Sequence, residues 1–277
     1  MKHTEGNFKG MRNANIYYQA WLPEGDVKAV LFIVHGVGEY CGRYTNVVNH
    51  FVPLGYAVYG LDHIGHGKSG GEREVIKRFE DFTEPLTTYY KMVTDWHPGK
   101  PVFIYGHSLG ALITLYYLLD HQADFKGAVI SAPPTKIPDN ISPITITLGK
   151  ILSAIAPKTG ILGLDTSSLS HDQEVVNAYV NDPLVFHGKI TACISAGMLR
   201  AMLRVNEEAG KISLPVFILQ GSADRIVDPG GAQLLYDKVG SKDKTLKVYE
   251  GLYHEVHNEP ERLTMFKDLE AWLKAHV

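Results

Sequence analysis

Short apolar runs alternate with longer amphipathic stretches along most of this chain. Expected strands cover residues 30–34, 56–61, 102–105, 127–131, 216–220 and 245–249, and expected helices cover 79–96, 109–121, 231–239 and 260–275. Strands alternating with helices form a parallel sheet, because each helix returns the chain to the same end of the sheet. Since the runs are apolar throughout, helices should cover both faces. The pattern predicts an α/β fold with a mostly parallel central sheet.

The alternation stops between Pro133 and Leu214. This stretch is far longer than the helix that a parallel crossover needs, and structureless loops of such length are uncommon in compact domains. An inserted cap, or lid, is the simplest explanation. We therefore expect residues 1–133 and 214–277 to form the core domain and residues 134–213 to form the cap.

The expected cap contains a segment rich in apolar side chains. They are Ile144, Ile146, Leu148, Ile151, Leu152 and Ile155, interrupted by Lys150 and Ser153. One interpretation is a helix packed on the core. The other is a lid whose apolar face lines an acyl-chain channel or contacts a lipid surface. The second gains weight only if the chemistry of the chain concerns lipids.

Composition excludes several classes of protein. The 27 Lys and Arg residues against 30 Asp and Glu give a net charge of -3 without a long basic run, so nucleic acid is not an expected partner. Cys41 and Cys193 lie far apart without metal-type spacing, which indicates free thiols or small core residues in a reducing compartment. The N-terminus lacks the apolar core of a secretion signal, and no run of about 18 apolar residues occurs. We expect a soluble, cytoplasmic protein.

The motif Gly106-x-Ser108-x-Gly110 lies between an expected strand and an expected helix. In this context it is typical of a nucleophile elbow, in which small flanking residues allow a sharp turn that exposes the serine hydroxyl. The helix start also favours a developing oxyanion, because its N–H groups are unpaired. We expect Ser108 to be the nucleophile and the N–H of Leu109 to be the first oxyanion donor.

A second donor is expected after the strand 30–34, where His35-Gly36-Val37-Gly38-Glu39 follows. Two glycines let this backbone turn an N–H inward, and Val37 is the candidate. The alternative is a plain glycine-rich turn. Dinucleotide binding is excluded because Cys41 stands where the third glycine of that motif should be.

The acid and the base should follow the nucleophile in the order Asp, then His, each after a late strand. Asp224 follows the strand 216–220, and His254 follows the strand 245–249. Asp228 is an alternative acid that could instead cap the next helix. His257 is an alternative base.

Two pairs of histidines raise the question of a metal site. These are His63 with His66, and His254 with His257. The second pair is one residue short of the zinc-protease spacing, so we expect no metal and interpret His63 and His66 as loop-holding residues. No cofactor is expected either.

Together the motifs of this chain closely resemble those of monoacylglycerol lipases, which are α/β-hydrolase-fold serine hydrolases that release a fatty acid and glycerol from monoglycerides. The motifs are His35 to Glu39 with Gly42-Arg43-Tyr44, Asp62 to Ser69, Gly106 to Gly110, Asn181-Asp182-Pro183-Leu184, and Leu219 to Arg225. The resemblance spans nearly the whole chain. It implies an α/β-hydrolase fold and a monoglyceride substrate. Since monoglycerides reside in membranes, we expect the apolar cap segment to shelter the acyl chain and to contact membranes peripherally.

The same resemblance implies roles for individual residues. Ser108, Asp224 and His254 would form the triad, and the amides of Val37 and Leu109 the oxyanion hole. A glycerol pocket would be formed by Glu39, Arg43, Tyr179 and His257.

The chain departs from animal members of the family at three positions. Those members carry Ala at the position of Val37, Met at that of Leu109 and Cys at that of Val227. The first two act through the backbone, so catalysis should survive, whereas loss of the cysteine predicts weaker sensitivity to thiol reagents.

Other functions remain compatible with such a fold. A lysophospholipase or a general carboxylesterase could use the same triad. A non-catalytic ligand-binding receptor is the more remote alternative.

Overall fold

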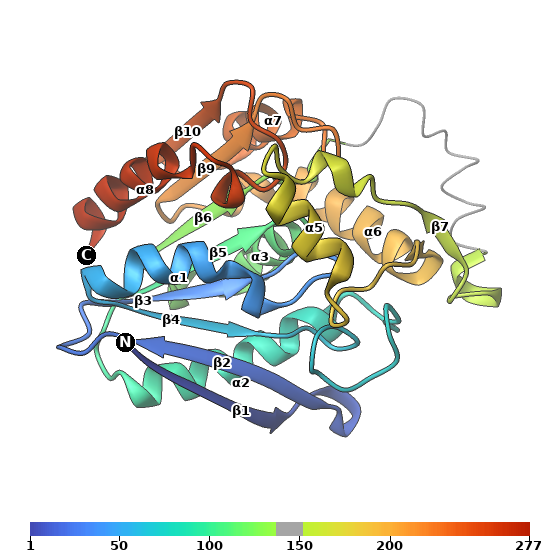
Figure 1. Ribbon diagram of the computed structural model, residues 1–277, viewed down its shortest axis with the longest axis horizontal. Helices are drawn as coiled ribbons and strands as arrows, with labels where there is room; N and C mark the ends of the chain where they lie inside the picture. Colours follow the sequence, from blue (N-terminus) through green and yellow to red (C-terminus); the bar gives the residue numbers. More distant parts are fainter. Residues whose placement is uncertain (137–151) are drawn as a thin grey trace.

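The computed structural model describes residues 1–136 and 152–277 and is built around an eight-stranded sheet (Figure 1). The strand order is β1-β2-β4-β3-β5-β6-β9-β10. The strands are β1 (Lys2–Lys9), β2 (Asn15–Leu22), β3 (Ala29–Val34), β4 (Tyr56–Leu61), β5 (Val102–His107), β6 (Gly127–Ser131), β9 (Val216–Gly221) and β10 (Lys244–Tyr249). From β4 to β10 all neighbours are parallel, whereas β2 is antiparallel to both β1 and β4. The predicted mostly parallel sheet is confirmed.

Helices cover both faces of the sheet, as expected. One face packs against α1 (Thr45–Phe51) and α8 (Arg262–His276), and the other against α2 (Glu80–Trp96), α3 (Leu109–His121), α6 (Ala192–Glu208) and α7 (Gly230–Lys238). In Figure 1, α1 and α8 lie in front of the sheet. The sheet is thus the middle layer of three.

Strand β3 illustrates why the central strands are apolar at every position. Val30, Phe32 and Val34 belong to the hydrophobic cluster on one face, and Leu31 and Ile33 to the cluster on the other. All five are fully buried. Because side chains alternate between faces, a strand covered on both sides has no position for a polar residue.

The N-terminal pair β1 and β2 was not predicted from the sequence. Side chains of β1 alternate between exposed and half-buried, and the strand carries Lys, His, Thr, Glu and Asn. It is the edge of the sheet, where polar side chains discourage pairing with other chains. Its register with β2, such as Thr4 opposite Ala20, adds an antiparallel hairpin to the parallel sheet.

Much of the described chain between β6 and β9 lies beyond the carboxyl ends of the parallel strands (Figure 1). Besides α6, it forms α5 (Gln173–Asn181) and a separate pair of strands, β7 (Gly160–Leu162) and β8 (Ile190–Thr191). Although α6 falls inside the expected cap, its Ile194 and Val205 join the core cluster that contains α3. The last helix of the expected cap therefore packs with the helices of the core.

The apolar segment of the expected cap is only partly described. Ile144, Ile146, Leu148 and Ile151 lie outside the described residues. Leu152 is half-buried, and the side chain of Ile155 is 77% exposed.

The loops that follow β3, β5, β9 and β10 carry the residues singled out from the sequence. All four leave the carboxyl ends of parallel strands, and such ends meet at one edge of a sheet. The fold thereby gathers segments that are more than 200 residues apart. No helix among the described residues is long and apolar enough to cross a bilayer.

Candidate active site

Ser108 occupies a strained turn between β5 and α3. Its backbone has φ 54° and ψ −122°, a conformation that residues other than glycine rarely adopt. A Cβ atom on Gly106 would lie 2.4 Å from the carbonyl oxygen of Gly110, and one on Gly110 would lie 2.0 Å from that of Val34. Both glycines are therefore required by close backbone packing, as the motif predicted. The turn places Ser108 at the start of α3 and in a pocket.

Two backbone N–H groups beside Ser108 have no partner among the described residues. They belong to Val37, in the loop after β3, and to Leu109, the first residue of α3. Val37 lines the same pocket as Ser108. An unpaired N–H at a helix start is normal, but the one on Val37 lies in a loop and needs another explanation. Both groups are available to a negatively charged oxygen.

His254 and Asp224 lie in contact within this site. Nδ1 of His254 is 2.7 Å from Oδ2 of Asp224, and because a carboxylate can only accept, Nδ1 carries the proton. The other oxygen of Asp224 accepts from the N–H groups of Ile226 and Val227 at 2.8 and 3.0 Å. Burial alone would raise the pKa of Asp224, but the charge of His254 and these hydrogen bonds outweigh it and lower the pKa. Asp224 thus remains ionised.

The alternative acid and base lie elsewhere. Asp228 accepts from the N–H of Gly230 at the start of α7 (2.8 Å) and pairs with Lys136 at the surface. His257 is fully buried and stacks on the ring of Tyr44, with ring centroids 4.9 Å apart. Asp224 and His254 are the acid and histidine that the structure brings together.

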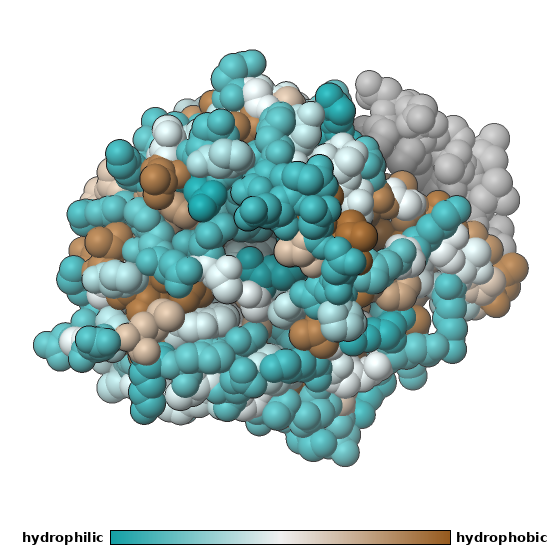
Figure 2. Space-filling model, in the orientation of Figure 1, coloured by the Kyte–Doolittle hydropathy of each residue, from teal (hydrophilic) through white to brown (hydrophobic). Residues whose placement is uncertain are grey.

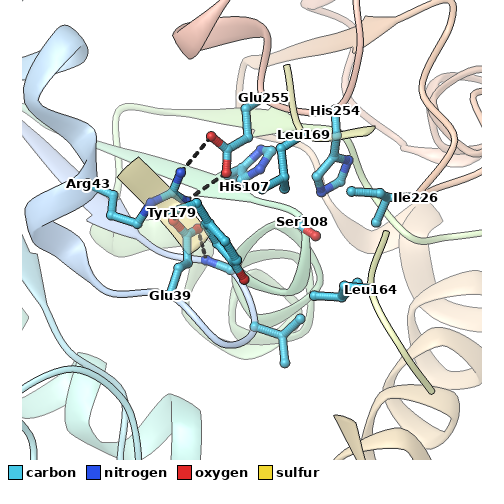
Figure 3. A pocket seen from close by; sticks show the side chains of 12 residues that line it. Glu39, Arg43, His107, Ser108, Leu164, Leu169, Tyr179, Ile226, His254 and Glu255 are labelled. Atoms are coloured by element: carbon cyan, nitrogen blue, oxygen red, sulfur yellow. Dashed lines mark hydrogen bonds and ion pairs between the residues drawn. The ribbon is translucent and has the colours of Figure 1, made fainter. Parts of the chain in front are cut away.

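The pocket around Ser108 draws residues from both halves of the chain (Figure 3). Its lining is Gly36, Val37, Glu39, Arg43, His107, Ser108, Leu164, Leu169, Tyr179, Ile226, His254 and Glu255. Figure 3 shows the ring of His254 and the hydroxyl of Ser108 on the same side of the pocket. The apolar lining from Leu164, Leu169 and Ile226 faces a polar wall around Arg43.

Comparisons with known proteins agree with this architecture. The hydrolase family Hydrolase_4, described as serine aminopeptidase S33, matches residues 25–261. The chain belongs to this family. A monoacylglycerol lipase from Mycolicibacterium smegmatis is 36% identical over 274 residues, which cover 99% of this chain and 98% of the relative. A human monoglyceride lipase is 34% identical over 261 residues, covering 93% and 86%.

The solved structures extend the agreement to the fold. The crystal structure of the Paleococcus ferrophilus monoacylglycerol lipase matches with a TM-score of 0.82 at 29% identity, and the match covers 100% of both chains. The expected α/β-hydrolase fold and the family inferred from the motifs are confirmed.

In this family member, the polar wall of the pocket is a buried network around Arg43. One guanidinium nitrogen donates to both Glu39 and Glu255 at 2.7 Å, and the other donates to Glu255 at 2.9 Å. The face of the guanidinium lies 4.6 Å from the centre of the Tyr179 ring. Burial raises the pKa of Glu39, whereas Arg43 outweighs burial at Glu255 and lowers its pKa to about 2. Two carboxylates thus share one guanidinium.

The four residues expected at the glycerol pocket are only partly brought together. Glu39, Arg43 and Tyr179 line the pocket. His257 does not, because its ring is packed behind the site against Tyr44. Glu39 is also engaged already, since its oxygens accept from Gly36 N–H (2.6 Å), the Tyr44 hydroxyl (2.8 Å) and Arg43.

Sequence reasoning missed two residues of the site. Glu255 is 2% exposed and lines the pocket, and Gln220 donates to Asp224 at 2.9 Å. Each is a polar residue next to a predicted part of the site: Gln220 lies at the end of β9, and Glu255 follows His254. That position was the available signal, but Arg43, the partner of Glu255, lies 212 residues away along the sequence.

His63 and His66 hold loops rather than converge with other ligands. In the described part of the chain, no group of three or more His, Cys, Asp or Glu side chains could hold a metal ion. The N–H of His63 donates to Nε2 of His35 at 2.9 Å, and Nε2 of His66 lies 2.8 Å from Oε1 of Glu74. Both histidines are buried beside the loop that carries Val37.

Replacing Gly110 tests the elbow. A Cβ in Gly110→Ala would contact two carbonyl oxygens at 2.5 Å or less, so the backbone must move. We expect a loss of about 1–3 kcal/mol in the free energy of unfolding and at least about tenfold slower labelling of Ser108 by a fluorophosphonate. Gly25→Ala is the control, because nothing lies within 4 Å of its Cβ position. Equal behaviour of both variants would contradict the packing argument.

The two aspartates give a matched pair for steady-state kinetics. Asp224→Asn should reduce kcat by about 10⁴-fold, because an amide cannot stabilise the imidazolium of His254. Asp228→Asn should stay within about twofold of the native enzyme, since Asp228 contacts the start of α7 and Lys136 at the surface. A larger loss from the second variant would reassign the acid.

His63 should make stability depend on pH. Burial lowers its pKa to about 3, far below the 6.5 of an unfolded histidine. As the pH falls from about 6.5, the unfolded chain binds this proton and the folded chain does not, so stability is lost. In His63→Gln, the slope of unfolding free energy against pH between 5 and 6 should decrease by up to about 1.4 kcal/mol per unit. Urea denaturation at several pH values measures it, and an unchanged slope would refute it.

Proposed function

We propose that this protein hydrolyses monoacylglycerols to fatty acid and glycerol, with Ser108 as nucleophile, His254 as base and Asp224 as its partner. The carrying observation is that a serine in a strained strand-to-helix turn shares one pocket with a histidine bound to a carboxylate. The monoacylglycerol lipases among its relatives support the choice of substrate.

The proposed reaction has two stages. Nε2 of His254 takes the proton of Ser108 while the serine oxygen attacks the ester carbonyl, and His254 then passes this proton to the departing glycerol. Water attacks the resulting acyl-enzyme, again with His254 as base, and releases the fatty acid. The N–H groups of Val37 and Leu109 would bind the oxyanion in both stages. Each donor contributes about 3 kcal/mol in comparable enzymes.

The charge of the polar wall favours a neutral headgroup. Arg43 is engaged with Glu39 and Glu255, and the ring of Tyr179 covers one of its faces. A phosphate there would meet two carboxylates against one guanidinium, with no unshared cation among the described residues that line the pocket. Glycerol hydroxyls, which donate and accept hydrogen bonds, suit such a wall. The polar wall therefore favours monoglycerides over lysophospholipids.

We further propose that residues 134–213 act as the cap. From this region Leu164, Leu169 and Tyr179 line the pocket. The region is joined to the loop after β3, because the Tyr40 hydroxyl donates to Asp182 at 2.6 Å and the N–H of Phe186 donates to the carbonyl of Gly38 at 2.8 Å. The cap would therefore enclose the headgroup side of the substrate.

A peripheral membrane contact is also proposed for this region. Ile155, Ile161 and Leu162 are 77%, 44% and 53% exposed. Figure 2 shows apolar side chains at the right edge of the molecule, where Figure 1 places β7. Exposed aliphatic side chains of this kind suit a lipid surface, which is where monoglycerides reside.

A carboxylesterase for short acyl chains is the second candidate. The cavity beside Ser108 has a volume of only about 20 Å³, so a short acyl group would need less displacement of the lining residues than a long acyl chain.

Fatty-acid release tests these proposals. We would assay monoacylglycerols of increasing chain length, lysophosphatidylcholine, a triacylglycerol and a short p-nitrophenyl ester, with the native enzyme and Ser108→Ala. We expect preference for monoacylglycerols and a loss of about 10⁴-fold or more in Ser108→Ala. Preference for the short ester would favour the second candidate. Activity that survives in Ser108→Ala would contradict the proposed mechanism. Equal rates of hydrolysis of dispersed and bilayer monoglyceride would contradict the proposed membrane contact.

A further inference from the structure

We propose that His35 is a positioning residue that sets the orientation of the Gly36–Val37 peptide and so points the Val37 N–H into the active site. This inference rests on the proposed function, because it concerns the second oxyanion donor. His35 does not line the pocket and acts only through the backbone that follows it.

The hydrogen bonds of His35 determine which ring nitrogen carries its proton. Its side chain is fully buried. Nε2 lies 2.9 Å from the backbone nitrogen of His63, and because that N–H can only donate, Nε2 must accept. The proton is therefore on Nδ1, which lies 2.8 Å from the carbonyl oxygen of Gly36 and donates to it.

Planarity of the peptide links this hydrogen bond to the oxyanion hole. The carbonyl of Gly36 and the N–H of Val37 belong to one peptide group, and all peptide bonds of the described residues are trans. In a trans peptide the two groups point in opposite directions. Holding the carbonyl against His35 therefore turns the N–H away from His35. In the opposite orientation the carbonyl oxygen would face the pocket and repel an oxyanion.

The surroundings of this peptide show where the N–H points. Gly36 and Val37 both line the pocket with Ser108, and a Cβ on Gly36 would lie 3.3 Å from the Cβ of Ser108. No described group accepts from the Val37 N–H. An unpaired loop N–H beside the nucleophile is what a preorganised oxyanion donor requires.

A glycine loop needs such a restraint. Gly36 and Gly38 flank Val37, and Gly38 already has a φ of 73°. Peptides beside glycine rotate at little steric cost. The peptide before Gly36 is fixed as well, because its N–H donates to Glu39 at 2.6 Å. Glu39 and His35 thus fix the peptides on either side of Gly36.

The His35 ring stays neutral, which preserves this arrangement. Burial, with the nearby His63, His66 and Arg43, lowers the pKa of His35 well below its usual range, against a smaller opposing effect of the Gly36 carbonyl. A second proton on Nε2 would also face the N–H of His63. One tautomer is therefore retained at neutral pH.

Two amide substitutions separate the two hydrogen bonds of His35. In His35→Asn the amide nitrogen takes the place of Nδ1 and can still donate to the Gly36 carbonyl. In His35→Gln the longer amide reaches the place of Nε2 and can accept from His63, but the Gly36 carbonyl loses its donor. We expect His35→Gln to lower kcat by about 100-fold with little change in KM, the effect of losing one oxyanion donor, and His35→Asn to stay within about tenfold.

The readouts distinguish positioning from stability. Affinity for an alkyl trifluoromethyl ketone, which forms an oxyanion on Ser108, should fall in parallel with kcat in His35→Gln. Thermal unfolding should shift similarly in both variants. Equal losses of kcat in the two variants, or full activity in His35→Gln, would overturn the proposal.

A measurement on the native protein is independent of how the variants fold. The ¹⁵N NMR spectrum should show the His35 proton on Nδ1, and a proton on Nε2 would overturn the proposal.

Failure of the proposed function would appear separately. The His35 variants can be compared with a short p-nitrophenyl ester as substrate, whatever the natural substrate is. Ester hydrolysis by Ser108→Ala would instead show that Ser108 is not the nucleophile.

Discussion

The close approach of α3 to the end of β3 is the contact on which the site depends. Because Gly110 has no side chain, the first turn of α3 packs directly against the carbonyls of Val34 and His35. This contact fixes the distance between the elbow and the loop that carries Val37, two segments about 70 residues apart. Ser108 lies beside this contact and has an unusual backbone conformation, whose strain the surrounding structure must stabilise.

On the opposite side of the pocket, a buried ion-pair network also fixes the relative position of two loops. Arg43, which follows β3, binds Glu255, which is adjacent to His254 and follows β10. The guanidinium thus ties the loop that carries His254 to the loop that carries Val37. Separating the two loops would leave buried charges unpaired, which is energetically unfavourable. The network therefore stabilises the relative position of these loops.

Sequence alone predicted the parts of the site that depend on local order along the chain. The elbow around Ser108, the acid after β9 and the histidine after β10 follow from strand-to-loop transitions. It did not predict β1, whose polar alternation reflects its place at the edge. Nor did it predict that His257 packs behind the pocket while Glu255 lines it. Those outcomes depend on contacts with Tyr44 and Arg43, some 210 residues away, which no local pattern encodes.

Burial assigns different tasks to the histidines of the site loops. His35, His107 and His257 are all buried, and burial lowers the pKa of each, so they remain neutral and serve as hydrogen-bonding or packing groups. Among these and His254, only His254 has a carboxylate in contact with its ring. A base must become positively charged during the reaction, and Asp224 is the group that can stabilise that charge. The roles proposed for these histidines therefore depend on the side chains around each ring. A sequence motif identifies a histidine, but a neighbouring carboxylate decides whether the positively charged ring is stabilised.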